Sequence, residues 1–229
     1  MNTKKTASAT KRKIAAIAAG ALVVGIGATY TLASWTDSEW VWGGAAGDTP
    51  GVGTDTFEVQ QDTSNTFANS AWNDRETNPG GALTFSAGQL SLSPGDAIYA
   101  PVALRTTAPS VAGTVTLRAA VAAAGVTPND TSGELWNAID VAVYTQKAAT
   151  TPFTRLGNCD ASVATDTTNW TQVTGVSDLS TAASVTQTLD AASGSVQHYC
   201  FVLTLPTGSP DSLQGRTIAP AWEFRSVSN

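Results

Sequence analysis

Histidine, cysteine and methionine are almost missing from this chain, and their scarcity limits the chemistry that it can perform. The 229 residues include one histidine, two cysteines and one methionine. A zinc peptidase needs two histidines on one helical turn with a glutamate between them, and the single His198 cannot build that site. No Gly-x-Ser-x-Gly nucleophile turn, phosphate-binding glycine loop or dinucleotide fingerprint is present. We therefore predict that the protein is not an enzyme and carries no cofactor or metal.

Positive charge is also scarce beyond the beginning of the chain. Five of the twelve lysines and arginines lie within residues 4–13, whereas all eighteen acids follow residue 33. Residues 34–229 therefore hold seven cations and eighteen acids, a net charge of −11. Nucleic acids and anionic membranes bind clustered lysine and arginine. We exclude both as partners of this part of the chain.

An uncharged run of small and branched residues follows the early cations and ends at Ala33. A basic start, an apolar stretch and small residues at the end are typical of a secretory signal peptide. Thr31 and Ala33 supply the small side chains that a signal peptidase requires, which predicts cleavage between Ala33 and Ser34. The run, at roughly 20 residues, is also long enough to span a bilayer if it is not cleaved. An uncleaved signal is the one membrane contact that we expect.

A family resemblance is carried by residues near this site, namely Lys11-Arg12-Lys13, Gly25-Ile-Gly-Ala28 and Leu32-Ala-Ser-Trp-Thr-Asp37. They resemble the alternate signal peptide cut by a SipW-type signal peptidase, which introduces the camelysin/TasA family of Gram-positive surface and matrix-fibre proteins. A weaker similarity covers His198–Pro206, Asp211–Gly215 and Ala221–Phe224. The resemblance implies SipW-dependent secretion to the cell surface or biofilm matrix, a jelly-roll fold and assembly into extracellular fibres.

Apolar residues alternate with polar ones in several short segments, as expected for half-buried strands. The clearest are 98–104, 115–121, 139–143, 199–205 and 218–224. Thr131 and Glu134 have the spacing of a capping box, which predicts one short helix after Thr131. These patterns predict an all-β, two-sheet antiparallel β-sandwich with that one helix and an N-terminal signal helix.

The domain organisation follows from changes in composition. Residues 1–33 are the predicted signal peptide, and residues 34–56 are a predicted arm and flexible linker whose second half is rich in glycine. Residues 57–229 are the predicted β-sandwich domain. Within it, Cys159 and Cys200 are expected to form a disulfide in an oxidising compartment, with two separate buried thiols as the alternative.

The arm is rich in aromatic and strand-forming residues, and four of them are the predicted contact residues: Trp35, Trp40, Val41 and Trp42. These side chains must be buried somewhere. Either the arm folds back on its own domain, or it adds a strand to a neighbouring copy. Repeated strand addition would produce a homo-oligomeric filament, because head-to-tail contacts propagate. We therefore expect a secreted structural protein.

Two other functions are alternatives. A monomeric adhesin would bind carbohydrate through aromatic side chains such as Trp72 and Trp170, which both lie in polar, turn-rich surroundings. An uncleaved signal would instead leave the domain as a membrane-tethered accessory protein.

Overall fold

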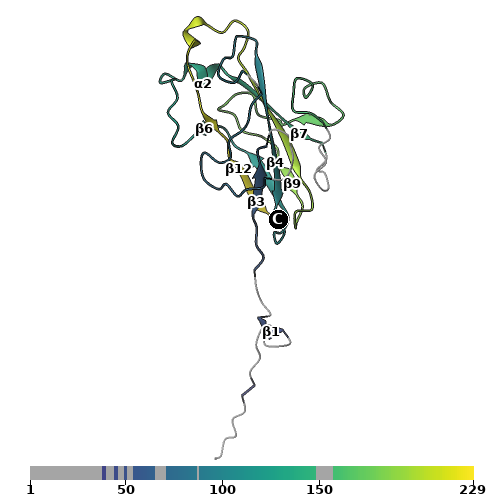
Figure 1. Cartoon of the computed structure of the whole chain (residues 1–229). Coiled ribbons are helices and arrows are strands. Elements are labelled where there is room, and N and C mark those ends of the chain that lie inside the picture. The colour runs from purple at the N-terminus through teal and green to yellow at the C-terminus, as the bar shows by residue number, and fades with distance from the viewer. Residues whose placement is uncertain are drawn as a thin grey trace, which may run out of the picture. The chain divides into compact units, whose positions relative to one another are not determined.

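A computed structural model describes residues 54–64, 71–86, 88–147 and 157–229, with short pieces at 38–39, 44–45 and 49–50 (Figure 1). The chain divides into two units, Met1–Gly53 and Thr54–Asn229. In the first unit, the backbone of β1 (Gly44–Ala45) pairs antiparallel with β2 (Thr49–Pro50), inside the predicted linker.

The larger sheet of the second unit has five antiparallel strands in the order β3-β4-β10-β7-β8. Its strands are β3 (Val59–Asp62), β4 (Ala97–Thr106), β10 (Gln197–Thr204), β7 (Asp140–Gln146) and β8 (Trp170–Gln172). Alternate side chains of the central strands point into the core, because successive residues of a strand face opposite sides of the sheet. The predicted inward sets of β4, β7 and β10 are confirmed, and they include Ile98, Val143 and Phe201.

The second layer is built from shorter strands. β12 (Phe224–Ser228), β5 (Gly113–Leu117) and β9 (Gln187–Leu189) form a three-stranded sheet in that order, and β11 (Pro220–Ala221) pairs with β6 (Val121–Ala122). Val115, Leu117 and Leu189 are buried in the same core as the larger sheet. The predicted all-β sandwich is therefore confirmed, while the jelly-roll order of its connections stays a prediction.

The strand predicted over 115–121 is shorter than expected. β5 ends at Leu117, and Ala120 rather than Ala119 is buried. Val121 belongs to β6 and is exposed, because its backbone pairs with β11 instead of continuing along β5. The apolar alternation in the sequence continues from β5 into β6, although the backbone changes its partner strand between them. The period of the sequence gives no sign of that change.

The short helix exists as α2 (Glu134–Ala138), but the predicted capping box is wrong. Thr131 does not cap the helix. The carboxylate of Asp130 instead accepts hydrogen bonds from the backbone amides of Leu135 at 3.2 Å and Trp136 at 2.9 Å. An aspartate satisfies two orphan amides at once because it has two acceptor oxygens. A single 3-10 turn, η1 (Asp211–Leu213), lies later in the chain.

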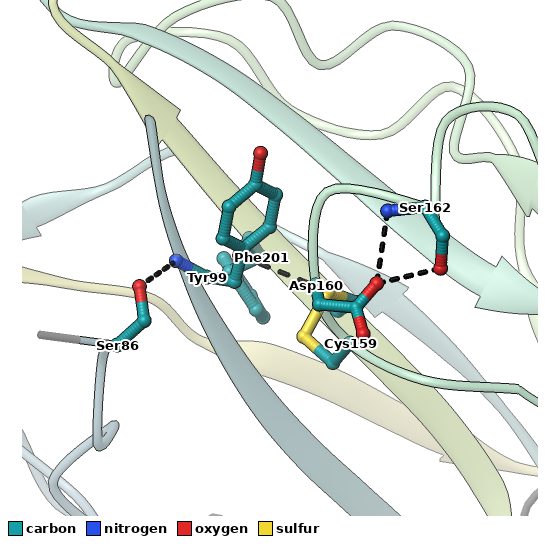
Figure 2. The surroundings of a disulfide bond; sticks show 7 residues. Ser86, Tyr99, Cys159, Asp160, Ser162 and Phe201 are labelled. Carbon is teal, nitrogen blue, oxygen red and sulfur yellow. Dashed lines mark hydrogen bonds between the residues drawn. A yellow bond between two sulfur atoms is a disulfide. The ribbon is translucent and has the colours of Figure 1, made fainter. Parts of the chain in front are cut away.

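A second, smaller cluster covers the outer face of the five-stranded sheet. Residues of the loop before β8 pack there against outward-facing side chains of β4 and β10, and the cluster contains Val163, Trp170, Ala103 and Cys200. The disulfide between Cys159 and Cys200 ties this loop to the middle of β10 (Figure 2). The predicted disulfide is thus confirmed. No helix in the described residues reaches the length and apolarity needed to cross a membrane.

Candidate functional site

Two edge strands lie close together on one side of the sandwich. β3 is the last strand of the five-stranded sheet, and β12 is the last strand of the three-stranded sheet. Within the described residues, β12 pairs only with β5. β3 pairs with β4 and carries one additional bridge, between Gln61 and Asn73. Edge strands expose unpaired backbone amides and carbonyls, so each can accept another strand.

A hollow of about 1310 Å³ opens between these two edges, and we call it the groove. Its floor is the inner face of the five-stranded sheet, and one wall is formed by the residues leading into β12. The floor and wall side chains include Ile98, Leu203, Phe85, Leu92, Trp222 and Phe224. The segments 82–86 and 88–92 form no strand where they line this hollow, and Leu83, Phe85 and Leu92 pack against the core there.

Aromatic rings join the wall of the groove to its floor. The ring of Phe201 lies 4.9 Å from that of Trp222 and 6.1 Å from that of Phe224, measured between centroids. Tyr199 also packs 4.9 Å from Phe224. Burial raises the pKa of the Tyr199 phenol, and its hydrogen bond with Thr145 opposes that shift only in part. These rings make the groove an aromatic surface that suits other aromatic side chains.

The rim of the groove exposes apolar side chains to solvent. Of the five large apolar side chains that are strongly exposed in the described part of the chain, three line the groove: Leu90 at 85%, Val121 at 55% and Val126 at 51%. Single exposed apolar residues are ordinary, but a group beside an apolar hollow marks an interaction site. The exposed apolar surface of the domain is therefore concentrated at this opening.

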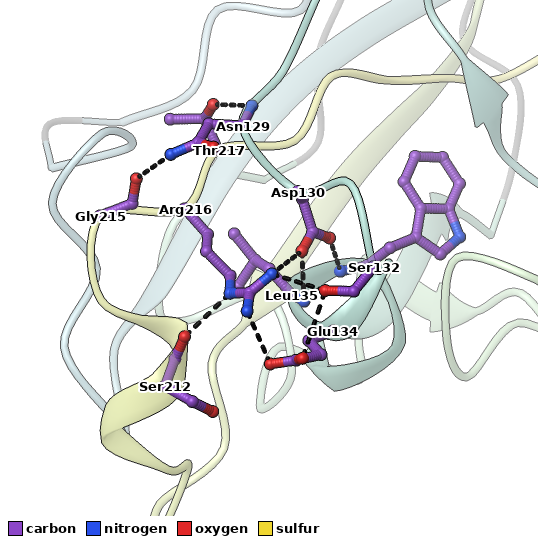
Figure 3. Close-up of polar contacts among 10 residues, drawn as sticks. Asn129, Asp130, Ser132, Glu134, Leu135, Ser212, Gly215, Arg216 and Thr217 are labelled. Carbon is purple, nitrogen blue, oxygen red and sulfur yellow. Dashed lines mark hydrogen bonds and ion pairs between the residues drawn. The ribbon is translucent and has the colours of Figure 1, made fainter.

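Arg216 lines the groove and is the centre of a charged cluster (Figure 3). The Arg216 guanidinium contacts Asp130 at 3.0 Å and Glu134 at 2.8 Å, and its Nε donates to the carbonyl of Ser212 at 2.8 Å. Burial by itself raises the pKa of Asp130. The hydrogen bonds from the backbone amides at the start of α2, together with Arg216, outweigh that effect and bring the pKa below its ordinary value.

Two other arginines line the groove without ion-pair partners. Arg75 and Arg225 are both exposed, and neither makes an ion pair with any residue that the structure describes. Acids also line the groove, including Glu76 and Glu223. The rim therefore combines charges of both signs around an apolar interior.

Sugar stacking through Trp170, one of the two predicted aromatics, does not fit the structure. Trp170 is only 2% exposed, because the disulfide-bonded loop covers it. Trp72 is half-buried, and the guanidinium of Arg105 lies 4.3 Å from its ring centroid. One face of Trp72 is thus already occupied. His198 on β10 is fully buried, and its Nδ1 lies 2.7 Å from Oε1 of Gln146.

The sequence-predicted site residues fall into two groups. The cysteines meet as predicted, whereas the cleavage residues Ala33 and Ser34 and the arm residues Trp35, Trp40, Val41 and Trp42 lie outside the described residues. Sequence reasoning missed the groove itself. The signal that could have indicated it is the apolar segment 82–92, whose Leu83, Phe85, Leu90 and Leu92 do not alternate as a strand.

In the described residues, no group of three or more histidine, cysteine or acidic side chains is arranged to hold a metal ion. Comparison of the chain with protein-family models, curated proteins and solved structures gives no match. The groove and the sequence of the arm are therefore the features that bear on function.

Proposed function

We propose that this protein is a secreted structural subunit that assembles into filaments by donating its N-terminal arm to the groove of the next copy. The observation that carries the proposal is the open groove between two edge strands, in a sandwich whose core is otherwise covered. A strand placed there would satisfy backbone groups and cover apolar side chains together. The camelysin/TasA resemblance, which implies fibre formation, agrees with this proposal.

The arm has the composition that the groove requires. Residues 34–42 contain three tryptophans and one valine, with no proline and no glycine to interrupt a strand. Burying one tryptophan removes about 150–250 Å² of surface from water, an upper estimate of about 4–6 kcal/mol. The free energy gained by burying several such side chains exceeds the free-energy cost of association only if the groove is already formed. The aromatic wall around Trp222 and Phe224 supplies that preformed surface.

Secretion controls when assembly begins. Before cleavage, the arm is joined to the signal peptide and remains at the membrane, where its first residue has no free end. Cleavage between Ala33 and Ser34 by a SipW-type signal peptidase releases the arm outside the cytoplasm. The Cys159–Cys200 disulfide suits the same oxidising compartment. The contact between copies is heterologous, so it propagates into a filament unless the rotation closes a ring.

The test compares the mature chain, residues 34–229, with a chain that begins at Gly43. Both are concentrated under oxidising conditions and examined by negative-stain electron microscopy and sedimentation. We expect filaments from the longer chain alone. A synthetic peptide of residues 34–42 should bind the shorter chain and quench or shift the fluorescence of Trp222. Two monomeric samples would contradict the proposal.

The alternatives make different predictions in the same samples. A carbohydrate-binding module stays monomeric at every concentration, and its glycan affinity falls when Trp72 is replaced. The burial of Trp170 and the contact of Arg105 with Trp72 leave that surface less aromatic than the sequence indicates. A membrane-tethered accessory protein retains residues 1–33, which an intact-mass measurement on protein from culture detects.

A further inference from the structure

We propose that the donated arm pairs antiparallel with the free edge of β12, in the register that sets Glu39 opposite Arg225. This inference rests on the proposed function and adds to it the acceptor strand, the direction and the residues that select the register. It follows from the side-chain pattern of β12, from the pattern of the arm and from the charges left unpaired at the groove.

β12 is the more open of the two edges. The free edge of β3 is already occupied at one point, because the amides of Gln61 and Asn73 each donate a hydrogen bond to the other's carbonyl at 2.9 Å. β12 has β5 on one side and the groove on the other. Its residues 224–226 line the groove together with Trp222 and Glu223, which precede the strand. An arriving strand therefore finds a longer uninterrupted edge on β12 than on β3.

The side chains of β12 alternate between two surfaces. Phe224 packs on the core, and Ser226 is partly buried in the same direction two residues later. Arg225 points the opposite way and is exposed. The arm shows a matching period: one face carries Ser38, Trp40 and Trp42, and the other carries Asp37, Glu39 and Val41. A strand added to a sheet continues the inward and outward faces of its neighbour.

One antiparallel register matches four facing pairs in chemical character, while Val41 and Asp37 face Glu223 and Val227 without such a match. Aromatic side chains then face aromatic rings, serine faces serine, and an acid faces a base. The pairs are Trp42 with Trp222, Trp40 with Phe224, Glu39 with Arg225 and Ser38 with Ser226. Directly opposite pairs of these kinds stabilise the pairing of two antiparallel strands.

The neighbouring registers lose these matches. An antiparallel slip by two residues in one direction pairs Asp37 with Arg225 but sets Glu39 against Glu223, which is repulsive, and Ser38 against Phe224. A slip in the other direction leaves Val41 opposite Arg225. A parallel arm with Glu39 at Arg225 places the tryptophans opposite serines and sets Asp37 against Glu223. Slips by one residue would turn Trp40 and Trp42 out of the groove. The matched register is therefore selected by repulsion as well as attraction.

Two features of the acceptor fit an arriving strand. Arg225 has no acid partner among the described residues, so it is available to an acid from another copy. The indole Nε1 of Trp222 is buried without an acceptor among those residues. A backbone carbonyl of the arm would supply one and so satisfy this donor.

The experiment reverses charges in the mature chain, residues 34–229. Arg225→Glu and Glu39→Arg should each raise the critical concentration for filament formation roughly fivefold, because an attractive pair becomes a repulsive one. The double variant should return to within about twofold of the unchanged chain, since the pair is restored in reverse. Circular dichroism and the midpoint of thermal unfolding verify that Arg225→Glu still folds.

Two variants serve as matched controls. Arg118→Glu makes the same charge change at an exposed arginine that does not line the groove, and Asp37→Arg changes the acid that would face Val227. Both should assemble at nearly the concentration of the unchanged chain. If Arg118→Glu or Asp37→Arg weakens assembly as much as Arg225→Glu, general electrostatics rather than the register is responsible, and the inference is overturned.

A cross-link tests the register directly. Ser38→Cys combined with Ser226→Cys should form disulfides between copies within filaments, seen as a ladder of covalent multimers on non-reducing gels. Filaments that ignore charge reversal and form no ladder would overturn the register and leave strand donation standing. Absence of filaments from the unchanged mature chain would overturn the proposed function, and the register with it.

Discussion

Asp130 connects the start of α2 to Arg216, which lines the groove. Its carboxylate accepts hydrogen bonds from the first turn of α2 and faces Arg216, so it joins α2 to the segment that follows η1. Its side chain is 2% exposed, whereas that of Glu134, the second partner of Arg216, is 46% exposed. A buried, doubly hydrogen-bonded carboxylate stabilises the fold more than an exposed ion pair does.

Replacement of Asp130 by asparagine should lower the free energy of unfolding at pH 7 by about 1–3 kcal/mol, because the amide exchanges one acceptor oxygen for a donor and removes the charge that faces Arg216. The pKa of Asp130 is lowered in the folded state. Its contribution is therefore fully present above its unfolded pKa of about 3.9 and is lost as the pH falls through the folded value. Urea unfolding between pH 7 and pH 3 should show a weaker acid dependence for Asp130→Asn.

Glu134→Gln is the matched control for that measurement. Because its carboxylate is largely in solvent, we expect a change of less than about 1 kcal/mol at pH 7. Equal losses for the two variants would show that the exposed ion pair, rather than the buried cap, stabilises the cluster around Arg216.

At the scale of elements, the loop before β8 is a cover for the outer face of the larger sheet. Val163 and Trp170 pack against Ala103 and Cys200, and the disulfide fixes the loop where it crosses β10. The glycine at 157 permits this packing, because a Cβ there would collide with the indole nitrogen of Trp170. This cover lies on the face of the sheet opposite the groove floor, so the two surfaces act independently.

Removal of the disulfide should destabilise the domain without changing the groove. The two cysteines are 41 positions apart, so opening the loop restores roughly 4 kcal/mol of chain entropy to the unfolded state. We expect the double variant Cys159→Ser and Cys200→Ala to lose most of that amount in urea unfolding. The double variant should not respond to a reducing agent, whereas the unchanged chain should.

If filaments form, the double variant should still form them below its unfolding temperature, because neither cysteine lines the groove. Loss of filaments from a folded double variant would place the disulfide in the assembly itself.

At the scale of the whole molecule, the exposed apolar side chains and the open sheet edges coincide. Leu90, Val121 and Val126 surround the same groove that β3 and β12 border. This arrangement is unfavourable for a monomer, because exposed apolar surface beside an unpaired strand edge favours aggregation. A subunit that receives a strand from its neighbour gains both backbone pairing and burial.

Substitution of Trp40 and Trp42 by serine should abolish filaments while the domain stays folded, because the arm lies outside the unit Thr54–Asn229. Electron microscopy and sedimentation report assembly, and thermal unfolding reports the fold. Thr36→Ala with Ser38→Ala is the control, since it changes small polar side chains on the same strand face. Equal filament formation by the tryptophan variant would defeat strand donation.

The sequence by itself determined the strands whose patterns are local. Residues 98–104, 139–143 and 199–205 each contribute to a strand with the predicted face inward, because residues two apart on a strand share one face of the sheet. The disulfide was also accessible from sequence, since a chain with two cysteines has one possible pairing within itself.

Tertiary structure decided those features that arise where segments far apart in the chain become neighbours. Asp130 displaced the Thr131 capping box because Arg216 lies beside it, and Val121 left the β5 pattern because β11 offered another partner. Trp170 is buried by a loop fixed through a distant cysteine. The groove is the clearest case, because β3 and β12, whose residues both line it, are far apart in the chain and belong to different sheets.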